Sequence, residues 1–292
     1  MAIPSSGTLA LSAIQTEFGG SNPISMSEYY AGGSNVPSGA TGDSGSIPSS
    51  GAVAVSQFYG STARVAIALT ISSTTQNYNI FANRGGTYSA GISDVTLTVQ
   101  AIVGSTGASG LDTGNQWTSG DTVKIINNSQ IVGRGGAGGA GGGQNAAGSA
   151  GAAAQNAINL GFATTIQNNG GFIRGGGGGG GGGNGTAITQ PGGGNKGQVP
   201  VTTQYGGGGG GGGQGQQGGA GSSGQAGGSA GSISAAGGGG SSTGTNGGSG
   251  GGFGAGGAAS SQAGGAAGKA VNLNGNSITW EDGSGNTQGA VS

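Results

Sequence analysis

The stretch Phe172-Ile173-Arg174, followed by nine consecutive glycines over Gly175–Gly183, decides what kind of fold this chain can adopt. A second uninterrupted run covers Gly206–Gly213. Elsewhere between positions 133 and 268 glycine recurs at every third residue, for example at 248, 251, 254 and 257. Glycine has no side chain to bury, so these segments cannot form a hydrophobic core of the usual kind. The order of this zone must come from backbone interactions.

Three interpretations compete for a glycine zone with a period of three. A flexible linker is the usual one, because ordering glycine costs more entropy than ordering any other residue. Collagen requires abundant proline, whereas this zone contains only Pro191 and Pro200. A bundle of polyglycine-II helices has three residues per turn, and its N–H and C=O groups bond to neighbouring helices. We favour the bundle, because the pure runs suit inner helices and the Gly-x-x segments suit outer ones.

Segments with apolar residues at every second position flank the glycine zone and predict β-strands. They are Ile126–Val132, Ile166–Arg174 and Val271–Trp280, and we expect them to form a base from which the bundle rises. The same alternation at Val65–Ile71 and Val95–Val99 predicts a small sandwich, or one sheet with a covered face. The pairs Asn127-Asn128 and Asn168-Asn169 are typical of tight turns.

A repeat marks the beginning of the chain. Ile3-Pro4-Ser5-Ser6-Gly7 recurs as Ile47-Pro48-Ser49-Ser50-Gly51, and Leu9–Ile14 then matches Val53–Phe58. A looser third copy is Ile24–Tyr29. Each copy predicts a very short strand followed by a helical turn, with Ser12 as the N-cap in the first. Such a module suits docking onto a partner better than catalysis.

The sequence therefore predicts a mainly β and irregular chain with four parts. These are an N-terminal docking module over 1–60, a small β domain over 61–132, a glycine-rich polyglycine-II bundle with variable loops over 133–270, and a C-terminal strand and tail over 271–292.

Composition argues against most kinds of chemistry. The 292 residues include 81 glycines, 7 basic and 8 acidic residues, and no His or Cys, for a net charge of −1. Zinc sites and the common nucleophile–base pairs are therefore absent, and we expect no catalytic residues, no cofactor and no metal site. The charge gives no steering towards nucleic acid, no apolar window is long enough for membrane insertion, and no signal peptide is recognisable.

Two groups of residues allow a second interpretation. Asp112, Asn115 and Asp121 could share a Ca²⁺ ion, although a polar hairpin loop explains them as well. Trp117 and Trp280 could be sugar platforms, although core positions in the β parts explain them better.

The glycine zone resembles a known family. Val132–Gly139, and Asn168–Gly171 leading into the first pure run, resemble the distal-tip adhesins of T-even-type phage long tail fibres. In that family a polyglycine-II sandwich presents loops that bind a bacterial surface receptor. The opening Ile3–Gly7 with Phe18–Ile24 and the closing Gly268–Gly275 are similar to other phage tail proteins. The first zone does not look like the attachment domain of the T-even tip adhesins, which leaves the docking partner open.

The resemblance implies a virion tail protein with two partners, other phage tail proteins at the N-terminal zone and a bacterial surface receptor, protein or glycan, at the loops. The alternative is a structural tail or baseplate component that touches no receptor; a secreted glycine-rich matrix protein is disfavoured by the missing signal peptide.

Counting eight passes through the bundle places 144–147, 184–205, 232–234 and 258–263 at the end remote from the base. Loops on rigid scaffolds concentrate binding residues. The candidate receptor-binding residues are Asn145, Thr186, Ile188, Gln190, Pro191, Lys196, Gln198, Val199, Tyr205, Ile233 and Gln262.

Overall fold

A computed structural model of the chain describes residues 3–37, 40–190, 201–205, 207–215, 218–219, 221, 226–242 and 244–292. The fold is mainly β, with parallel sheets and few helices in this part of the chain. It divides into two compact units. The first comprises Met1–Leu69, Phe81–Leu97 and Gln116–Lys124, and the second comprises Thr70–Ile80, Thr98–Asn115 and Ile125–Ser292.

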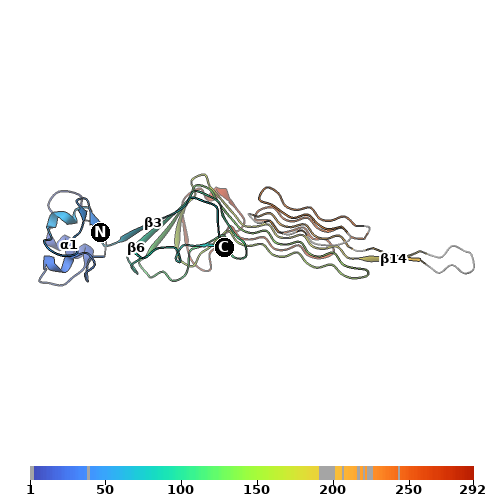
Figure 1. Cartoon of the computed structure of the whole chain (residues 1–292), viewed down its shortest axis with the longest axis horizontal. Helices are drawn as coiled ribbons and strands as arrows, with labels where there is room; N and C mark the ends of the chain where they lie inside the picture. Colours follow the sequence, from blue (N-terminus) through green and yellow to red (C-terminus); the bar gives the residue numbers. More distant parts are fainter. Residues whose placement is uncertain are drawn as a thin grey trace, which may run out of the picture. The chain divides into compact units, whose positions relative to one another are not determined.

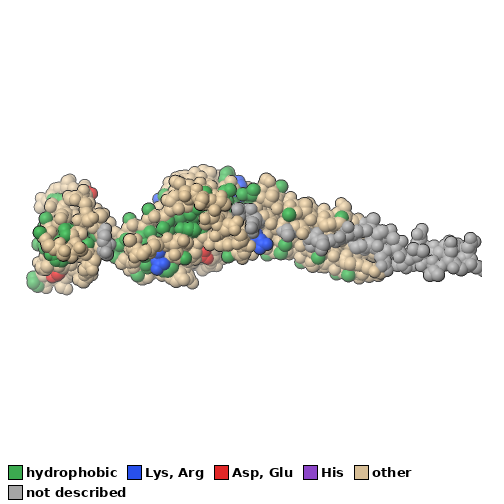
Figure 2. Space-filling model, in the orientation of Figure 1, with side chains coloured by type: hydrophobic (Ala, Val, Ile, Leu, Met, Phe, Trp, Pro, Cys, Tyr) green, Lys and Arg blue, Asp and Glu red, His purple; other side chains and the backbone are tan. Residues whose placement is uncertain are grey.

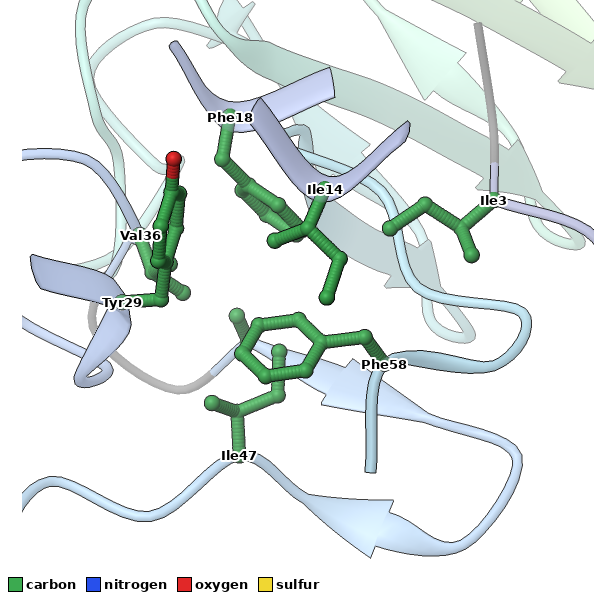
Figure 3. Close-up of a cluster of buried hydrophobic side chains, with 8 residues drawn as sticks. Ile3, Ile14, Phe18, Tyr29, Val36, Ile47 and Phe58 are labelled. Atoms are coloured by element: carbon green, nitrogen blue, oxygen red, sulfur yellow. The ribbon is translucent and has the colours of Figure 1, made fainter. Parts of the chain in front are cut away.

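The N-terminal repeat builds a small hydrophobic core in the first unit (Figure 3). Its elements are α1 (Leu11–Phe18), the 3-10 helices η1 (Met26–Tyr29) and η2 (Val55–Phe58), and the strands β1 (Thr41–Gly42) and β2 (Gly45–Ser46). Ile14, Tyr29 and Phe58 end the three copies of the repeat, and all three have no exposed surface. The ring of Phe58 packs edge-on against Tyr29 at 6.3 Å and against Phe18 at 5.8 Å.

The expected cap at Ser12 is wrong. Helix α1 begins one residue earlier, at Leu11, and Ala10 before it offers no side-chain cap. The backbone oxygen of Ser12 instead accepts a hydrogen bond from the Thr16 hydroxyl at 2.8 Å. In the third copy, Ser25 does accept from the N–H of Ser27, at 3.4 Å.

Three sheets contain most of the remaining strands. Their orders are β17-β12-β9-β6-β3, β18-β13-β10-β7-β4 and β16-β11-β8-β5, so the chain visits the sheets in turn, as in a parallel β-helix. The bounds are β3 Val65–Ile71, β4 Thr75–Gln76, β5 Tyr78–Asn79, β6 Ser93–Val99, β7 Val103–Gly104, β8 Leu111–Asp112, β9 Thr122–Asn127, β10 Gln130–Val132, β11 Ile158–Asn159, β12 Thr164–Gln167, β13 Phe172–Arg174, β16 Val271–Asn272, β17 Ile278–Asp282, and, after η3 (Ser284–Asn286), β18 Thr287–Gln288.

Apolar side chains stack in register inside these sheets. Ile131 pairs with Val103 on one side and Ile173 on the other, and all three are fully buried. Leu111, Ile158 and Val271 form a second buried stack. The expected sandwich over 61–132 is therefore wrong, because its strands share sheets with strands from 158–174 and 271–288. Alternation identifies a strand with one apolar face but not the neighbour of that strand.

The two asparagine pairs lie where the chain bends between strands, and the Gly170 N–H donates to the Asn168 carbonyl at 2.7 Å, but neither pair takes the expected left-handed conformation. Asn127 and Asn168 are buried at the ends of β9 and β12, where the Asn127 amide donates to Asn168 Oδ1 at 2.8 Å. The Asn168 amide donates to the backbone oxygen of Gly283 at 3.0 Å. In the described residues the left-handed asparagines are instead Asn77, Asn145 and Asn274. The buried asparagines satisfy backbone groups where successive strands end.

The glycine-rich zone consists of extended segments that lie side by side (Figure 1). Successive backbone N–H groups between 176 and 183 donate to three neighbouring segments in turn. Residues 176, 179 and 182 donate to 155, 152 and 149; residues 177, 180 and 183 donate to 214, 211 and 208; residues 178 and 181 donate to 255 and 258. Their carbonyls accept from 136–142, 248–251 and 265–268. The first pure run therefore has six hydrogen-bonded neighbours.

The two pure runs are antiparallel neighbours, as the sequence predicted, because the partner number falls as the donor number rises. The expected count of eight passes is wrong. The Gly231 N–H donates to Gly219 at 2.9 Å, and the Ala258 N–H donates to Ser249 at 2.9 Å, so the chain reverses within both 218–231 and 247–257. The described residues form ten segments, 133–143, 148–157, 175–185, 207–215, 218–219 with 221, 226–231, 235–242, 245–252, 255–259 and 263–268. Glycine permits a reversal without interrupting its own period, as at Gly254 with φ +65°.

Candidate functional site

Several turns meet at the end of the glycine-rich zone remote from β13. The N–H groups of 133, 136, 139 and 142 donate to 174, 177, 180 and 183, so these two segments run in the same direction and finish together. The turns 143–147 and 259–263, together with residues 242 and 244–246, lie at this end, which we call the far end. Strand β14 (Thr186–Gln190) begins there and pairs antiparallel with β15 (Val201–Tyr205), with Thr186 opposite Tyr205.

Asn184 joins the turns of the far end. Its Oδ1 atom accepts from the Gly148 N–H at 3.0 Å and from the Gln262 amide at 3.4 Å. Its own N–H donates to Ser261 Oγ at 3.1 Å, and its carbonyl accepts from the Thr245 N–H at 3.3 Å. One residue at the end of the first pure run therefore holds three separate turns in place.

The described surface of the far end is polar and uncharged. Asn246 Oδ1 accepts from the Ser242 N–H at 2.9 Å, and the Asn246 carbonyl accepts from the Ser260 hydroxyl. Exposed Asn145 holds its backbone at φ +51°. The space-filling view shows few charged side chains on the visible face (Figure 2). Such a surface can recognise a ligand by shape and by amide and hydroxyl hydrogen bonds, and it offers no acid–base pair among its described residues.

The structure brings some of the predicted site residues together. Asn145, Thr186 and Gln262 all lie at the far end, where the Gly185 N–H also donates to the Ala146 carbonyl at 3.0 Å. The other predicted residues of the hairpin are Ile188 and Gln190 in β14 and Tyr205 in β15. Four predicted residues lie outside the described residues, namely Pro191, Lys196, Gln198 and Val199.

The placement of Ile233 at this surface is wrong. Gly209 and Gly212 donate to Ala226 and Ser229, so segment 226–231 runs in the same direction as the second pure run. The turn 232–234 therefore lies beside Gln214, whose amide donates to the Ile233 carbonyl at 3.1 Å. This is the end nearest β13. The sequence was misleading because the glycine period does not change where the chain reverses.

Sequence reasoning missed Asn184, Asn246 and Ser261. Asn184 is the first residue after the longest glycine run, and that position is the signal that could have identified it. The roles of Asn246 and Ser261 depend on which segments are neighbours, and no local pattern reveals that.

The acidic residues considered for Ca²⁺ have other partners. Asp112 accepts from the Gly114 N–H at 2.6 Å and from the Asn159 amide at 2.9 Å. Asp121 accepts from the Tyr88 hydroxyl at 2.7 Å, the Thr118 N–H at 2.9 Å and the Ser93 N–H at 3.1 Å. The part of the chain that the structure describes contains no cluster of three or more His, Cys, Asp or Glu residues suited to a metal ion.

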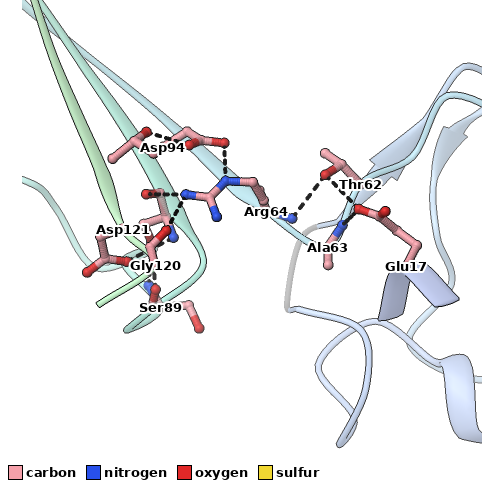
Figure 4. A network of polar contacts seen from close by, with 10 residues as sticks. Glu17, Thr62, Ala63, Arg64, Ser89, Asp94, Gly120 and Asp121 are labelled. Atoms are coloured by element: carbon pink, nitrogen blue, oxygen red, sulfur yellow. Dashed lines mark hydrogen bonds and ion pairs between the residues drawn. The ribbon is translucent and has the colours of Figure 1, made fainter. Parts of the chain in front are cut away.

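A network of hydrogen bonds and an ion pair in the first unit is centred on Arg64 (Figure 4). Arg64 Nε donates to Asp94 Oδ2 at 2.7 Å, and Arg64 Nη2 donates to the Gly120 carbonyl at 2.7 Å. Burial alone would raise the pKa of Asp94, but hydrogen bonds from Arg64 and Thr122 outweigh it and lower that pKa. Burial would likewise raise the pKa of Asp121, yet its hydrogen bonds lower it. These carboxylates are structural ion-pair and hydrogen-bond partners.

The tryptophans differ in burial. Trp117 is buried, with its ring 4.8 Å from Phe81 and 5.7 Å from Tyr88. Trp280 is only half-buried on β17, so the expected core position is wrong for it. In the described residues no helix is long and apolar enough to cross a membrane.

Comparison with known proteins identifies a family that matches this chain. The family described as phage tail fibre adhesin Gp38 matches residues 66–292, which is most of the chain. The chain belongs to this family. As a tail fibre adhesin it is a component of the phage tail, and the resemblance to tip adhesins seen in the glycine zone is confirmed.

Among solved structures, this adhesin is similar to the gp37-gp38 adhesin tip complex of the bacteriophage S16 long tail fibre. The identity is 25%, with 81% of this chain and 86% of that chain covered, and the TM-score is 0.47. No curated protein sequence matches the adhesin.

Proposed function

We propose that this tail fibre adhesin recognises a bacterial surface receptor through the far end, and that a bundle of polyglycine-II helices holds the far-end loops in place. The observation that carries the proposal is the set of turns joined by Asn184 at the end of a lattice of backbone hydrogen bonds.

The polyglycine-II assignment is supported by a threefold period in bonding. Three residues per turn point successive N–H groups towards three different neighbours, as observed between 175 and 183. The segments also approach too closely for any side chain. A Cβ atom added at any residue from 175 to 183 would lie 1.9–2.0 Å from a backbone oxygen of another segment. Glycine is therefore required by the distance between segments.

Such a lattice suits receptor binding because it fixes the starting points of the loops. Every inner segment is bonded to its neighbours at each turn, so the ends of 143–147 and 259–263, with residues 242 and 244–246, have little freedom relative to one another. Loops on a rigid scaffold tolerate sequence change while keeping their arrangement. The neutral surface favours recognition by shape and hydrogen bonding rather than by charge.

We further propose that the N-terminal module attaches the adhesin to other tail proteins. It has a core of its own, and it lies almost entirely before residue 66, where the family match begins. The proposed function is binding without catalysis, since the described surface of the far end carries neither paired carboxylates nor a nucleophile with a base. The second candidate, a structural tail component without receptor contact, predicts that the far-end loops can change without effect on adsorption.

A loop replacement tests the proposal. Replacing 186–203 by a short Gly-Ser linker should leave the thermal unfolding temperature nearly unchanged and abolish adsorption of phage carrying the variant. The matched control replaces the short 3-10 helix η3 (Ser284–Asn286), which has no buried residue, by Gly-Gly-Ser and should adsorb normally. Normal adsorption by the loop variant would reject recognition through this loop and favour the structural alternative.

A further inference from the structure

A second surface feature lies at the opposite end of the glycine-rich zone from the far end. A hollow of about 570 Å³ is lined there by Arg174, Gln214, Ile233, Ser234, Phe253 and Gln288. These residues come from the end of β13, the end of the second pure run, the two turns 232–234 and 252–254, and β18. Volumes of this size are typical of small-molecule sites.

The walls of the hollow are held by specific bonds. The Gln214 amide donates to the Ile233 carbonyl at 3.1 Å, and Gln214 Oε1 accepts from the Phe253 N–H at 3.2 Å. The Gly175 N–H donates to the Gln288 carbonyl at 2.9 Å. The two turns and β18 are therefore fixed around Arg174 before any ligand arrives.

Among the described residues that line the hollow, Arg174 is the only ionisable one. Its guanidinium carbon lies 4.0 Å from the centre of the Phe172 ring and 5.2 Å from that of Phe253. Its Nη1 donates to Gln130 Oε1 at 3.3 Å, and its Nε atom is buried without a partner. No carboxylate pairs with it among the described residues, and the sequence from 133 to 268 contains no Asp or Glu.

Two other arginines show what distinguishes Arg174. Arg84 and Arg134 also have a buried Nε atom without a partner, but each donates a short hydrogen bond to a backbone carbonyl, at 2.6 and 2.8 Å. Arg174 has one long bond to a side-chain amide instead. Its cationic group is positioned by aromatic rings and keeps its remaining donors available for an anion.

The rest of the lining suits a polyhydroxylated ligand. Exposed Ser234 and Gln288 supply a hydroxyl and an amide, while Ile233, 36% exposed, and Phe253 supply an apolar face. A sugar ring has hydroxyl groups at its edge and C–H groups on its faces, and an acidic sugar adds an anionic group for the arginine. We propose that this hollow binds a sugar carrying a carboxylate or phosphate group, with Arg174 pairing with the anionic group.

Sugar binding by the full-length protein tests the assignment. Saturation-transfer NMR should detect glucuronic acid and glucose 6-phosphate, while glucose should bind at least about tenfold more weakly, because it lacks the charge-assisted hydrogen bonds. Arg174→Met keeps an apolar stem beside the rings and should weaken the acidic sugars at least about tenfold. Gln288→Ala, at an exposed side chain, should weaken them several-fold without affecting folding. Gln100→Ala, at an exposed position outside the hollow, should leave sugar binding unchanged.

Three results would overturn the proposal. The first is equal binding of glucose and glucuronic acid. The second is undiminished acidic-sugar binding by a folded Arg174→Met or, should that variant not fold, by Gln288→Ala. The third is inorganic phosphate binding as tightly as glucose 6-phosphate, which would leave an anion site without sugar specificity.

Discussion

Replacing Gly179 by alanine should unfold the glycine-rich zone, and the structure gives the size of the effect. The added Cβ atom would lie 1.9 Å from the Ala137 carbonyl oxygen and 2.4 Å from its carbon. Ordinary van der Waals contact begins at 3.4 Å, so segment 133–143 must move away by about 1.5 Å. Its N–H groups at 136 and 139 donate to 177 and 180 at 2.8 Å, and a shift of this size breaks both bonds.

Each buried backbone group that loses its partner costs about 1–3 kcal/mol. Two broken bonds leave four such groups, so the expected loss of about 4–12 kcal/mol is comparable with the whole stability of a typical domain. The control is Gly238→Ala, where the added Cβ atom meets only Ser229 Oγ at 3.7 Å. That variant should match the wild type or gain up to about 1 kcal/mol from lower chain entropy.

Scanning calorimetry of the two alanine variants measures the difference directly. We expect a lost or greatly lowered transition for Gly179→Ala and an unchanged one for Gly238→Ala. A Gly179→Ala protein within about 1 kcal/mol of the wild type would refute the reasoning, because the lattice would then tolerate a side chain where the structure leaves no space for one.

Two further predictions concern buried polar groups. Asp121→Asn should lower the free energy of unfolding by about 2–4 kcal/mol at pH 7, since the Tyr88 hydroxyl and the Thr118 and Ser93 N–H groups donate to this carboxylate. The pKa of Asp121 lies below its ordinary 3.8, so the stabilisation that its carboxylate provides is present above about pH 4 and is lost as the pH falls through the folded-state pKa. In urea denaturation from pH 7 to pH 2, the free energies of unfolding of the wild type and Asp121→Asn should therefore converge. A constant difference between them would contradict this. Asn168→Ala should cost about 2–3 kcal/mol in the same assay, whereas exposed Asn169→Ala should cost under about 0.5 kcal/mol. Equal costs for the two substitutions would argue that the hydrogen bonds of the buried Asn168 side chain do not stabilise the fold.

The sequence predicted those features that depend on short-range patterns. Alternation identified buried positions such as Val95, Leu97 and Ile125, and uninterrupted glycine identified segments surrounded by other segments. A period of two or three is a property of one segment, so it can be recognised without knowing the neighbours of that segment.

Pairing between segments could not be predicted in the same way. The strands around Val103, Ile131 and Ile173 lie far apart in sequence, and nothing in each of them specifies the others. The reversal within 218–231 leaves no mark on the glycine period, so Ile233 was assigned to the wrong end. Asn184 was missed for the same reason, since its partners come from three separate turns.

Receptor contact at the far end is the central claim, and cysteine protection tests it most directly. The chain has no Cys, so a single introduced thiol reports on one position. Gln144→Cys and Ala259→Cys place thiols at exposed far-end positions, and Ser284→Cys places one in an exposed turn next to β17. Each cysteine variant is first mixed with saturating host cells, and the thiol reagent is then added. Compared with the variant alone, thiol labelling should fall at least about fivefold at 144 and 259 and stay unchanged at 284. Protection at 284 with free labelling at 144 and 259 would contradict the account.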